Sequence, residues 1–220
     1  MANPTIYNTL RCIRQGGSVT KDLSKLLFEK KDLLVLTFAN LLVQALITFY
    51  ALKKHSAEKK SRYINIGAWF GLFGIVLILS LVSMPIWVKF ILFCLFSYGW
   101  GYSLSDVASF DILYDAWIGT VSIFGIMFSI GLMMMLSGIR LGIKTGIILF
   151  YSLLGLILAT LFTTSNIISI IGIIIFSIYV IYDTNKILQK NYYGDFITAS
   201  LDYYLDVLNL FVNLVNIYDQ

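Results

Sequence analysis

Residues 201–211 read LDYYLDVLNLF and set two aspartates among leucines and aromatic residues. A second segment, IYDTN at residues 181–185, closes a long apolar stretch with another aspartate. Both segments are hydrophobic enough to enter a lipid bilayer, where a carboxylate is costly and by default marks a functional site. They predict a membrane protein whose acids near the C-terminus carry its function.

The composition of the whole chain also indicates a membrane protein. Of its 220 residues 59% are hydrophobic and 13% are charged, whereas soluble domains carry roughly 25% charged residues. A membrane-spanning helix needs about 20 mostly apolar residues. Seven stretches approach or meet that length, at residues 33–52, 64–83, 86–104, 116–136, 141–162, 167–182 and 201–217.

These stretches predict an all-α integral membrane protein, a bundle of seven transmembrane helices. We expect Pro85 to mark a short turn between the second and third helices, since proline cannot continue a helix. The last stretch is short and carries acids. It either crosses the membrane or forms a re-entrant helix that the other helices enclose, because its polar groups cannot face lipid.

The charged residues divide the chain into a basic tail, residues 1–31, and a transmembrane domain, residues 32–220. Apolar residues repeat at helical spacing within the tail, which is either an interfacial helix in the headgroup layer or a solvated segment. Most lysines and arginines lie on the side of the tail, which favours a cytoplasmic N-terminus, although the loop 53–62 opposes it. The net charge of +4 therefore reflects membrane topology, and we expect a lipid bilayer rather than a nucleic acid as partner.

The last helix carries a polar stripe. Residues separated by alternating steps of four and three share one face of an α-helix. Five polar residues follow this spacing, namely Asp202, Asp206, Asn209, Asn213 and Asn216. Exposure of that face to lipid would leave its polar groups without partners, so we expect it to face other helices or water.

Asp183 and Asp206 are candidates for a pH-sensing pair. The 23 residues between them allow the chain to leave one helix, turn and return antiparallel. Two carboxylates within hydrogen-bond distance titrate as a unit, and gain or loss of a proton would change how the helices hold together. The alternative is a pair of aspartates at helix ends that headgroup water solvates.

Other chemistries of membrane proteins fit poorly. An intramembrane aspartyl protease needs Gly-x-Gly-Asp, but position 192 is tyrosine and Asp195 falls in a polar loop. A retinal protein needs a lysine in the last span, and residues 201–217 contain none. The single histidine, His55, lies in a lysine-rich loop. We therefore expect no enzyme activity, no cofactor and no metal site.

The two motifs resemble those of the Bax inhibitor family, which includes the Lifeguard and Golgi anti-apoptotic proteins. The match consists of Tyr-Asp-Thr-Asn at 182–185 and Tyr-Leu-Asp-Val-Leu-Asn-Leu-Phe at 204–211. The resemblance implies six helices around a central seventh, with Asp183 and Asp206 as a pH-sensing pair. It also implies a calcium-leak channel that lowers organelle calcium and restrains apoptosis, with calcium as the transported ion.

The chain departs from the family pattern in three places. Family members often carry an arginine near the end of the second helix, where residues 77–89 contain only Lys89. Many carry a glutamate in the third helix, where residues 96–100 read FSYGW. Three further aspartates form an acidic loop, which either gathers cations at a pore mouth or is simply solvated: Asp106, Asp111 and Asp115.

Two other functions remain alternatives to a leak channel. One is a non-conducting membrane regulator of cell death that binds apoptotic proteins or calcium channels, and the other is a proton-coupled transporter. Substitution of Asp206 by asparagine would change calcium flux in a channel but not the activity of an adaptor. The resemblance places the protein in the endoplasmic reticulum or Golgi if its source is eukaryotic or viral, and in the inner membrane if bacterial.

Overall fold

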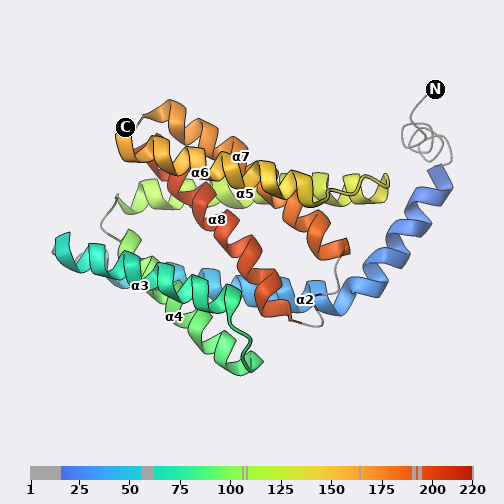
Figure 1. Ribbon diagram of the computed structural model, residues 1–220, viewed down its shortest axis with the longest axis horizontal. Helices are drawn as coiled ribbons and strands as arrows, with labels where there is room; N and C mark the ends of the chain where they lie inside the picture. The colour runs from blue at the N-terminus through green and yellow to red at the C-terminus, as the bar shows by residue number, and fades with distance from the viewer. Residues whose placement is uncertain are drawn as a thin grey trace.

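The computed structural model describes residues 16–55, 62–105, 107, 109–163, 165–189, 192 and 195–219, and the side chains of 16–27, 62–70 and 161 lie outside the described part. The described chain is all-α, with seven helices and no strand (Figure 1). The helices are α2 (Gly16–His55), α3 (Arg62–Leu81), α4 (Ile86–Leu104), α5 (Phe110–Leu136), α6 (Ile143–Phe162), α7 (Asn166–Gln189) and α8 (Phe196–Tyr218).

Breaks between helices occur where the local sequence requires them. Pro85 has extended backbone angles (φ −56°, ψ 143°) and stands directly before α4, as the sequence predicts. Gly138 adopts a φ of +76° in the turn after α5, a conformation that favours glycine. Asp195 caps α8 by accepting a hydrogen bond of 3.0 Å from the backbone N–H of Thr198.

Four described segments are long and apolar enough to cross a membrane, at Phe28–His55, Phe110–Leu136, Ile143–Thr160 and Asn166–Gln189. They confirm an α-helical membrane bundle, whereas seven crossings and a re-entrant last helix stay predictions. Residues 1–15 of the predicted tail lie outside the described residues. The rest of that tail forms the first turns of α2, which runs without a break across position 31.

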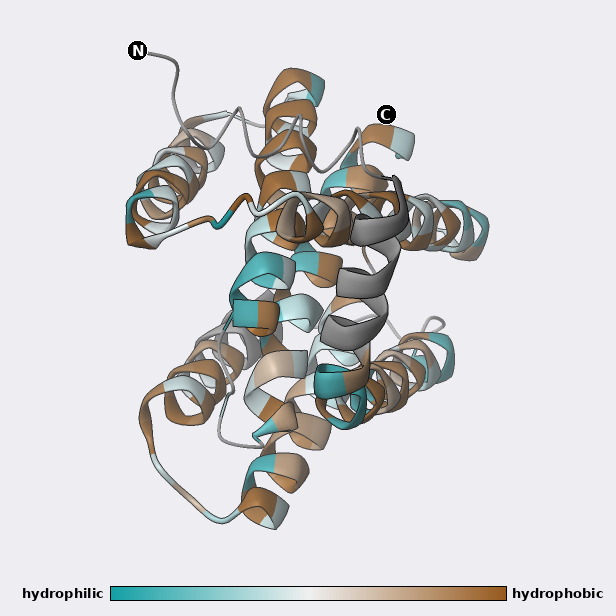
Figure 2. Cartoon of the chain, turned by 90° about the vertical axis from the view of Figure 1, so that its right-hand side faces the viewer, coloured by the Kyte–Doolittle hydropathy of each residue, from teal (hydrophilic) through white to brown (hydrophobic). Residues whose placement is uncertain are grey.

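The C-terminal helix α8 occupies the interior of the bundle (Figure 1). It packs against α2, α4, α5 and α7, while α3 packs on α4 and α6 packs on α7. Apolar residues cover most of the helices (Figure 2), and many lie on the outer surface, such as Ile143 at 79% and Phe162 at 86% exposure. Lipid suits such a surface, since exposed apolar area of this extent is unusual in water.

An aromatic cluster holds α8 in place. The ring of Tyr203 stacks on Phe38 of α2, with 5.8 Å between ring centroids, and meets the edge of Phe124 of α5 at 5.3 Å. Tyr203 is fully buried. Each aromatic pair of this kind contributes about 0.5–1.5 kcal/mol beyond its buried area. The cluster therefore fixes the direction in which the Tyr203 hydroxyl points.

Candidate functional site

The two predicted sensor acids lie on helices that pack directly against each other. Asp183 is in the last turns of α7 and Asp206 is in the middle of α8. Both are buried, with 7% and 4% exposure, and they are near enough for their charges to interact. A proton-sharing contact between them stays a prediction.

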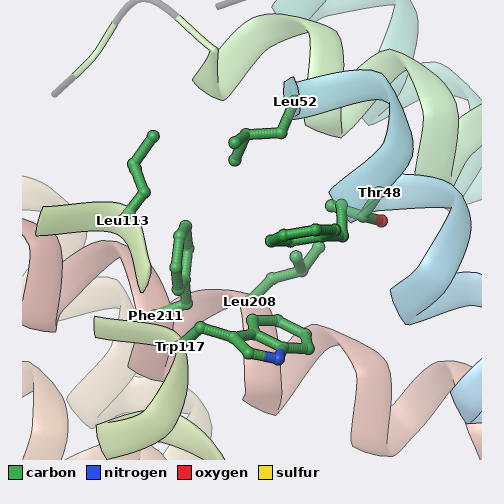
Figure 3. Close-up of a pocket in the computed structure, with 7 residues that line it drawn as sticks. Thr48, Leu52, Leu113, Trp117, Leu208 and Phe211 are labelled. Carbon is green, nitrogen blue, oxygen red and sulfur yellow. The ribbon is translucent and has the colours of Figure 1, made fainter. Parts of the chain in front are cut away.

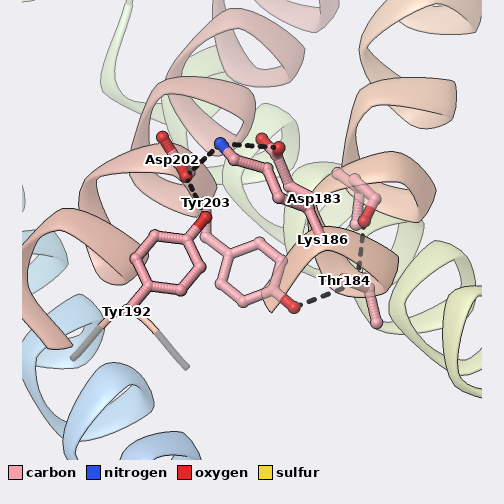
Figure 4. A network of polar contacts seen from close by, with 7 residues as sticks. Asp183, Thr184, Lys186, Tyr192, Asp202 and Tyr203 are labelled. Atoms are coloured by element: carbon pink, nitrogen blue, oxygen red, sulfur yellow. Dashed lines mark hydrogen bonds and ion pairs between the residues drawn. The ribbon is translucent and has the colours of Figure 1, made fainter. Parts of the chain in front are cut away.

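Lys186 bridges two acids of this site (Figure 4). Its ammonium group lies 3.5 Å from Oδ1 of Asp183, one turn earlier on α7, and 2.6 Å from Oδ2 of Asp202 on α8. Tyr192, in the connection between these helices, donates a hydrogen bond of 2.8 Å to the same Asp202 oxygen. Lys186 therefore joins α7 to α8 through Asp202 and pairs with Asp183 within its own helix.

Asp206 has the least satisfied carboxyl group of the site. Its Oδ2 atom is buried and has no hydrogen-bond partner among the described residues. A buried polar atom without a partner costs about 1–3 kcal/mol, and more when it is charged. A proton, a water molecule or a cation that reached this oxygen would therefore lower the free energy of the site.

The two segments at residues 181–185 and 201–211 also contact each other through uncharged groups. The hydroxyl of Tyr203 donates a hydrogen bond of 3.0 Å to Oγ1 of Thr184, and Thr184 donates to the carbonyl of Val180 at 2.7 Å (Figure 4). Both side chains are buried. Residues 181–185 thus supply one acid and one hydroxyl to the contact between α7 and α8, and residues 201–211 supply two acids and one hydroxyl.

Asn185, the last residue of the first motif, holds the turn between α5 and α6. Its amide donates to the carbonyl of Ile139 at 2.9 Å, and its Oδ1 accepts from the backbone N–H of Leu141 at 2.9 Å. Gln189 adds a hydrogen bond of 3.1 Å to the carbonyl of Leu141. The motif therefore fixes a neighbouring turn as well as the site.

The sequence is similar to those of known proteins. The family model described as "Inhibitor of apoptosis-promoting Bax1" matches residues 31–220, which is most of the chain. The chain belongs to the Bax inhibitor family. It is also similar to two proteins of Arabidopsis thaliana, Protein LIFEGUARD 1 and Protein LIFEGUARD 2.

The matches to these curated relatives are short. The chain is 46% identical to Protein LIFEGUARD 1 over 54 residues, which are 24% of this chain and 23% of that protein. It is 41% identical to Protein LIFEGUARD 2 over 44 residues, which are 20% of this chain and 18% of that protein. The chain thus matches less than a quarter of the length of either relative.

The cation of the site differs from the arginine that Bax inhibitor proteins often carry. Lys89 is the only charged residue of residues 77–89, where that arginine would be expected. It binds Asp195 and lies 3.0 Å from Oγ1 of Thr198, both at the start of α8. The cation beside the sensor acids is instead Lys186 of α7. The predicted site did not include Lys186, although a lysine three residues after Asp183 is a signal for a contact along one helix face.

The remaining polar residues of α8 interact less strongly. The amides of Asn209 and Asn213 donate to carbonyls of their own helix, at 2.7 and 2.8 Å. Gly172 of α7 lies against Asn213, where an added Cβ would collide with the asparagine side chain. Asn216 is exposed. The stripe from Asp202 to Asn213 therefore runs along the side of α8 that carries the α7 contacts.

The predicted acidic loop lies elsewhere. Asp111 and Asp115 are exposed in the first two turns of α5, and Asp106 lies outside the described residues. Among the described side chains, no three histidines, cysteines or acids converge as ligands of a metal ion would. The two described aspartates of this loop, Asp111 and Asp115, are therefore exposed to solvent or to lipid headgroups.

A second polar network joins α8 to α2 and α4. Gln44 of α2 is fully buried. Its side-chain amide donates a hydrogen bond of 3.1 Å to Asn40, also on α2. Its Oε1 accepts a hydrogen bond of 2.8 Å from the hydroxyl of Ser97 on α4. Asn40 donates to Ser200 of α8 at 2.5 Å. Thr48 shares a hydrogen bond with Tyr204 of α8 and donates to the carbonyl of Ser97 at 3.1 Å. The spacing of Asn40, Gln44 and Thr48 along one helix face was the available signal.

An apolar crevice lies beyond this network, between α2, α5 and α8 (Figure 3). Its walls include Leu52 of α2, Leu113 and Trp117 of α5, and Phe211 of α8, with Thr48 at one edge. It has no charged side chain in its lining. Its chemistry suits a hydrocarbon group rather than an ion.

Proposed function

We propose that the chain is a pH-sensitive calcium-leak channel of the Bax inhibitor type, which lowers organelle calcium and restrains apoptosis. Asp183 and Asp206 would act as the sensor that gates it. The observation that supports this proposal best is an oxygen of Asp206 that has no hydrogen-bond partner among the described residues and is buried in the contact between α7 and α8, beside the buried acid Asp183.

The charge balance of the site accounts for pH sensitivity. Three acids and Lys186 share the contact between α7 and α8: Asp183, Asp202 and Asp206. A low-dielectric interior strengthens every charge interaction, so the number of protons on the acids decides whether the two helices attract or repel. Protonation of one acid also depends on the charge of the others. A change in pH would therefore change how α7 sits on α8.

The bundle offers a route for such a change to act on ion flow. In this proposal the chain crosses the membrane seven times and α8 is the central helix, either crossing or re-entrant. Movement of α7 relative to α8 would open a polar path along the stripe from Asp202 to Asn213. Calcium would follow that path because carboxylate and amide oxygens are its preferred ligands.

Calcium flux into proteoliposomes at several pH values tests this proposal. We compare the wild-type protein with Asp183→Asn and Asp206→Asn, and use Asp32→Asn as a matched control, since Asp32 is an exposed acid of α2. We expect pH-dependent flux in the wild type and the control, and loss of the pH dependence in both sensor variants.

Absence of flux above that of empty liposomes, from protein shown to be folded, would overturn the channel. The family description, which names an inhibitor of apoptosis-promoting Bax1, would then favour a non-conducting regulator that binds partner membrane proteins.

A further inference from the structure

Helix α8 carries polar contacts on two opposite sides. Ser200 and Tyr204 contact α2, whereas Asp202 contacts Lys186 of α7. Ser200 and Asp202 are two residues apart, as are Tyr204 and Asp206, and two residues turn an α-helix by about 200°. The uncharged contacts and the acids therefore lie on opposite faces of one helix.

We propose that the network centred on Gln44 is the fixed side of α8. It keeps α8 on α2 and α4 in every protonation state of the sensor, so that a change in pH moves α7 away from α8 and leaves α2, α4 and α8 together. Gln44 is then a positioning residue, which acts on the acids through α8. This inference rests on the proposed pH sensing.

The position of Gln44 suits this role, since it touches two helices and supports the contact to a third. Its amide also lies 3.7 Å from Sγ of Cys94 on α4, and its backbone carbonyl accepts a hydrogen bond of 2.9 Å from Thr48. Asn40 and Thr48, one turn before and after it, make the two contacts with α8. Removal of the Gln44 side chain would take a hydrogen bond from Asn40 and another from Ser97, whereas Thr48 would keep its bonds to backbone carbonyls.

The groups of this network do not titrate in the physiological range. Amides and the hydroxyls of serine and threonine keep their protons, and so do tyrosine hydroxyls at neutral pH. The network is also buried from water: Asn40, Gln44, Thr48, Ser97 and Ser200 are at most 4% exposed. Its strength therefore stays the same while that of a charged contact changes with pH.

A charged contact at the start of α8 reinforces the same side. Lys89 of α4 forms an ion pair with Asp195, the residue that caps α8. Although burial opposes ionisation, hydrogen bonds from Lys89 and Thr198 lower the pKa of Asp195 below its ordinary value. Asp195 thus keeps its charge through mild acidification, and the link between α4 and α8 remains.

The opposite face of α8 holds the charged and titratable groups of the site. Those from α7 are Asp183, Lys186 and Tyr179; those from α8 itself are Asp202, Asp206 and Tyr203; and Tyr192 comes from the connection between the two helices. The contacts that α2 supplies to α8 in the second network come from the uncharged Asn40 and Thr48. An added proton therefore changes the interactions on one side of α8 and leaves those on the other side unchanged.

Distances between spin labels test the inference. Labels are placed on lipid-exposed Leu42 of α2 and Ile178 of α7, each paired with exposed Asn216 of α8, in the full-length reconstituted chain with both cysteines replaced by serine. Between neutral and acidic pH we expect the α7–α8 distance distribution to shift and the α2–α8 distribution to stay constant. A shift of the α2–α8 pair overturns the inference but leaves the proposed pH sensing intact. Absence of any shift overturns both.

Gln44→Met tests the positioning role, because methionine has a similar volume and lacks the amide. We expect the α2–α8 distance to become pH-dependent in this variant. Leu46→Met is the matched control on the same helix, since Leu46 is 59% exposed, and the distance should stay constant there.

If Gln44→Met fails to fold, Ser97→Ala removes a single hydrogen bond to Gln44 and should give a smaller effect of the same kind. A constant α2–α8 distance in a folded Gln44→Met or Ser97→Ala protein excludes the role.

Discussion

Tyr203 of α8 donates a hydrogen bond of 3.0 Å to Thr184 of α7, and this bond joins the first family motif to the residue directly before the second. Asp183 is the residue before Thr184, and Asp206 lies one turn after Tyr203 along α8. Both partners of this bond are uncharged hydroxyl groups. The bond therefore brings the two acids to the same helix–helix contact without adding a charge there. It contributes to the position of the acids and leaves their protonation free to vary.

Tyr203→Phe should weaken the fold slightly and keep the pH response. The ring stays among Phe38, Phe124 and Phe128, and Thr184 keeps its bond to the carbonyl of Val180. Loss of one buried hydrogen bond costs about 0.5–1.5 kcal/mol. Denaturant unfolding in detergent micelles measures that loss, with Tyr114→Phe at an exposed position of α5 as control. If calcium flux in Tyr203→Phe no longer depended on pH, the hydroxyl would belong to the sensor itself.

Lys186→Met should destabilise the protein most at neutral pH. Lys186 is the cation between Asp183 and Asp202, and its removal leaves buried acids that repel each other. Its side chain is 26% exposed, so the cost is about 1–3 kcal/mol, below that of breaking a fully buried ion pair. At acidic pH the acids are protonated and the difference from wild type should shrink. Thermal unfolding across a range of pH measures this. The control is Lys144→Met, at an exposed position of α6, and a difference that does not vary with pH would contradict the expected repulsion.

The sequence predicts the class of fold and the place of the acids well, because both depend on local patterns. Hydropathy alone predicts helical segments, and most ends agree with the structure to within a few residues. There are four exceptions. Three helices begin earlier than predicted: α2 at Gly16 rather than residue 33, α5 at Phe110 rather than residue 116, and α8 at Phe196 rather than residue 201. The fourth, α7, ends at Gln189 rather than residue 182. In each case the extra turns contain polar residues, which helices tolerate outside the hydrocarbon layer.

Hydrogen bonds between residues far apart in the chain could not be predicted from the sequence. The bond from Asn40 to Ser200 joins residues 160 positions apart, and single serines or threonines in a membrane helix are too common to predict a network. The bridge from Lys186 to Asp202 depends on the angle between α7 and α8. Hydropathy does not encode that angle, and it is set by packing around Tyr203 and Gly131, where an added Cβ would lie 2.8 Å from that of Thr184.

Asp195→Asn should remove the ion pair with Lys89 while it keeps the cap of α8, because asparagine caps helices as well as aspartate does. The pKa of Asp195 is lower in the folded protein than in the unfolded chain. Its charge therefore stabilises the fold above its ordinary pKa of about 3.9, and this contribution is lost as pH falls through the lower, folded value. The pair is partly exposed and screened, so we expect a loss of about 1 kcal/mol at neutral pH. Unfolding curves of wild type and variant should differ at pH 7 and converge in strong acid; a constant gap would assign the effect to the cap.

Gly101→Ala should force α4 away from α2. An added Cβ at position 101 would collide with the backbone carbonyl of Thr48 and lie 2.9 Å from the Cβ of Ala51. Backbone atoms cannot rotate aside, so overpacking of about 1–3 kcal/mol follows. Thr48 also carries the contact to Tyr204, so the second polar network should loosen together with the helix pair.

Gly125→Ala is the matched control, because nothing lies within 4 Å of the added Cβ there, and alanine stabilises a helix by about 1 kcal/mol relative to glycine. In thermal unfolding we expect a lower midpoint for Gly101→Ala than for the wild type, and an unchanged or higher midpoint for Gly125→Ala. Equal midpoints for the two variants would refute the close approach of α4 to α2.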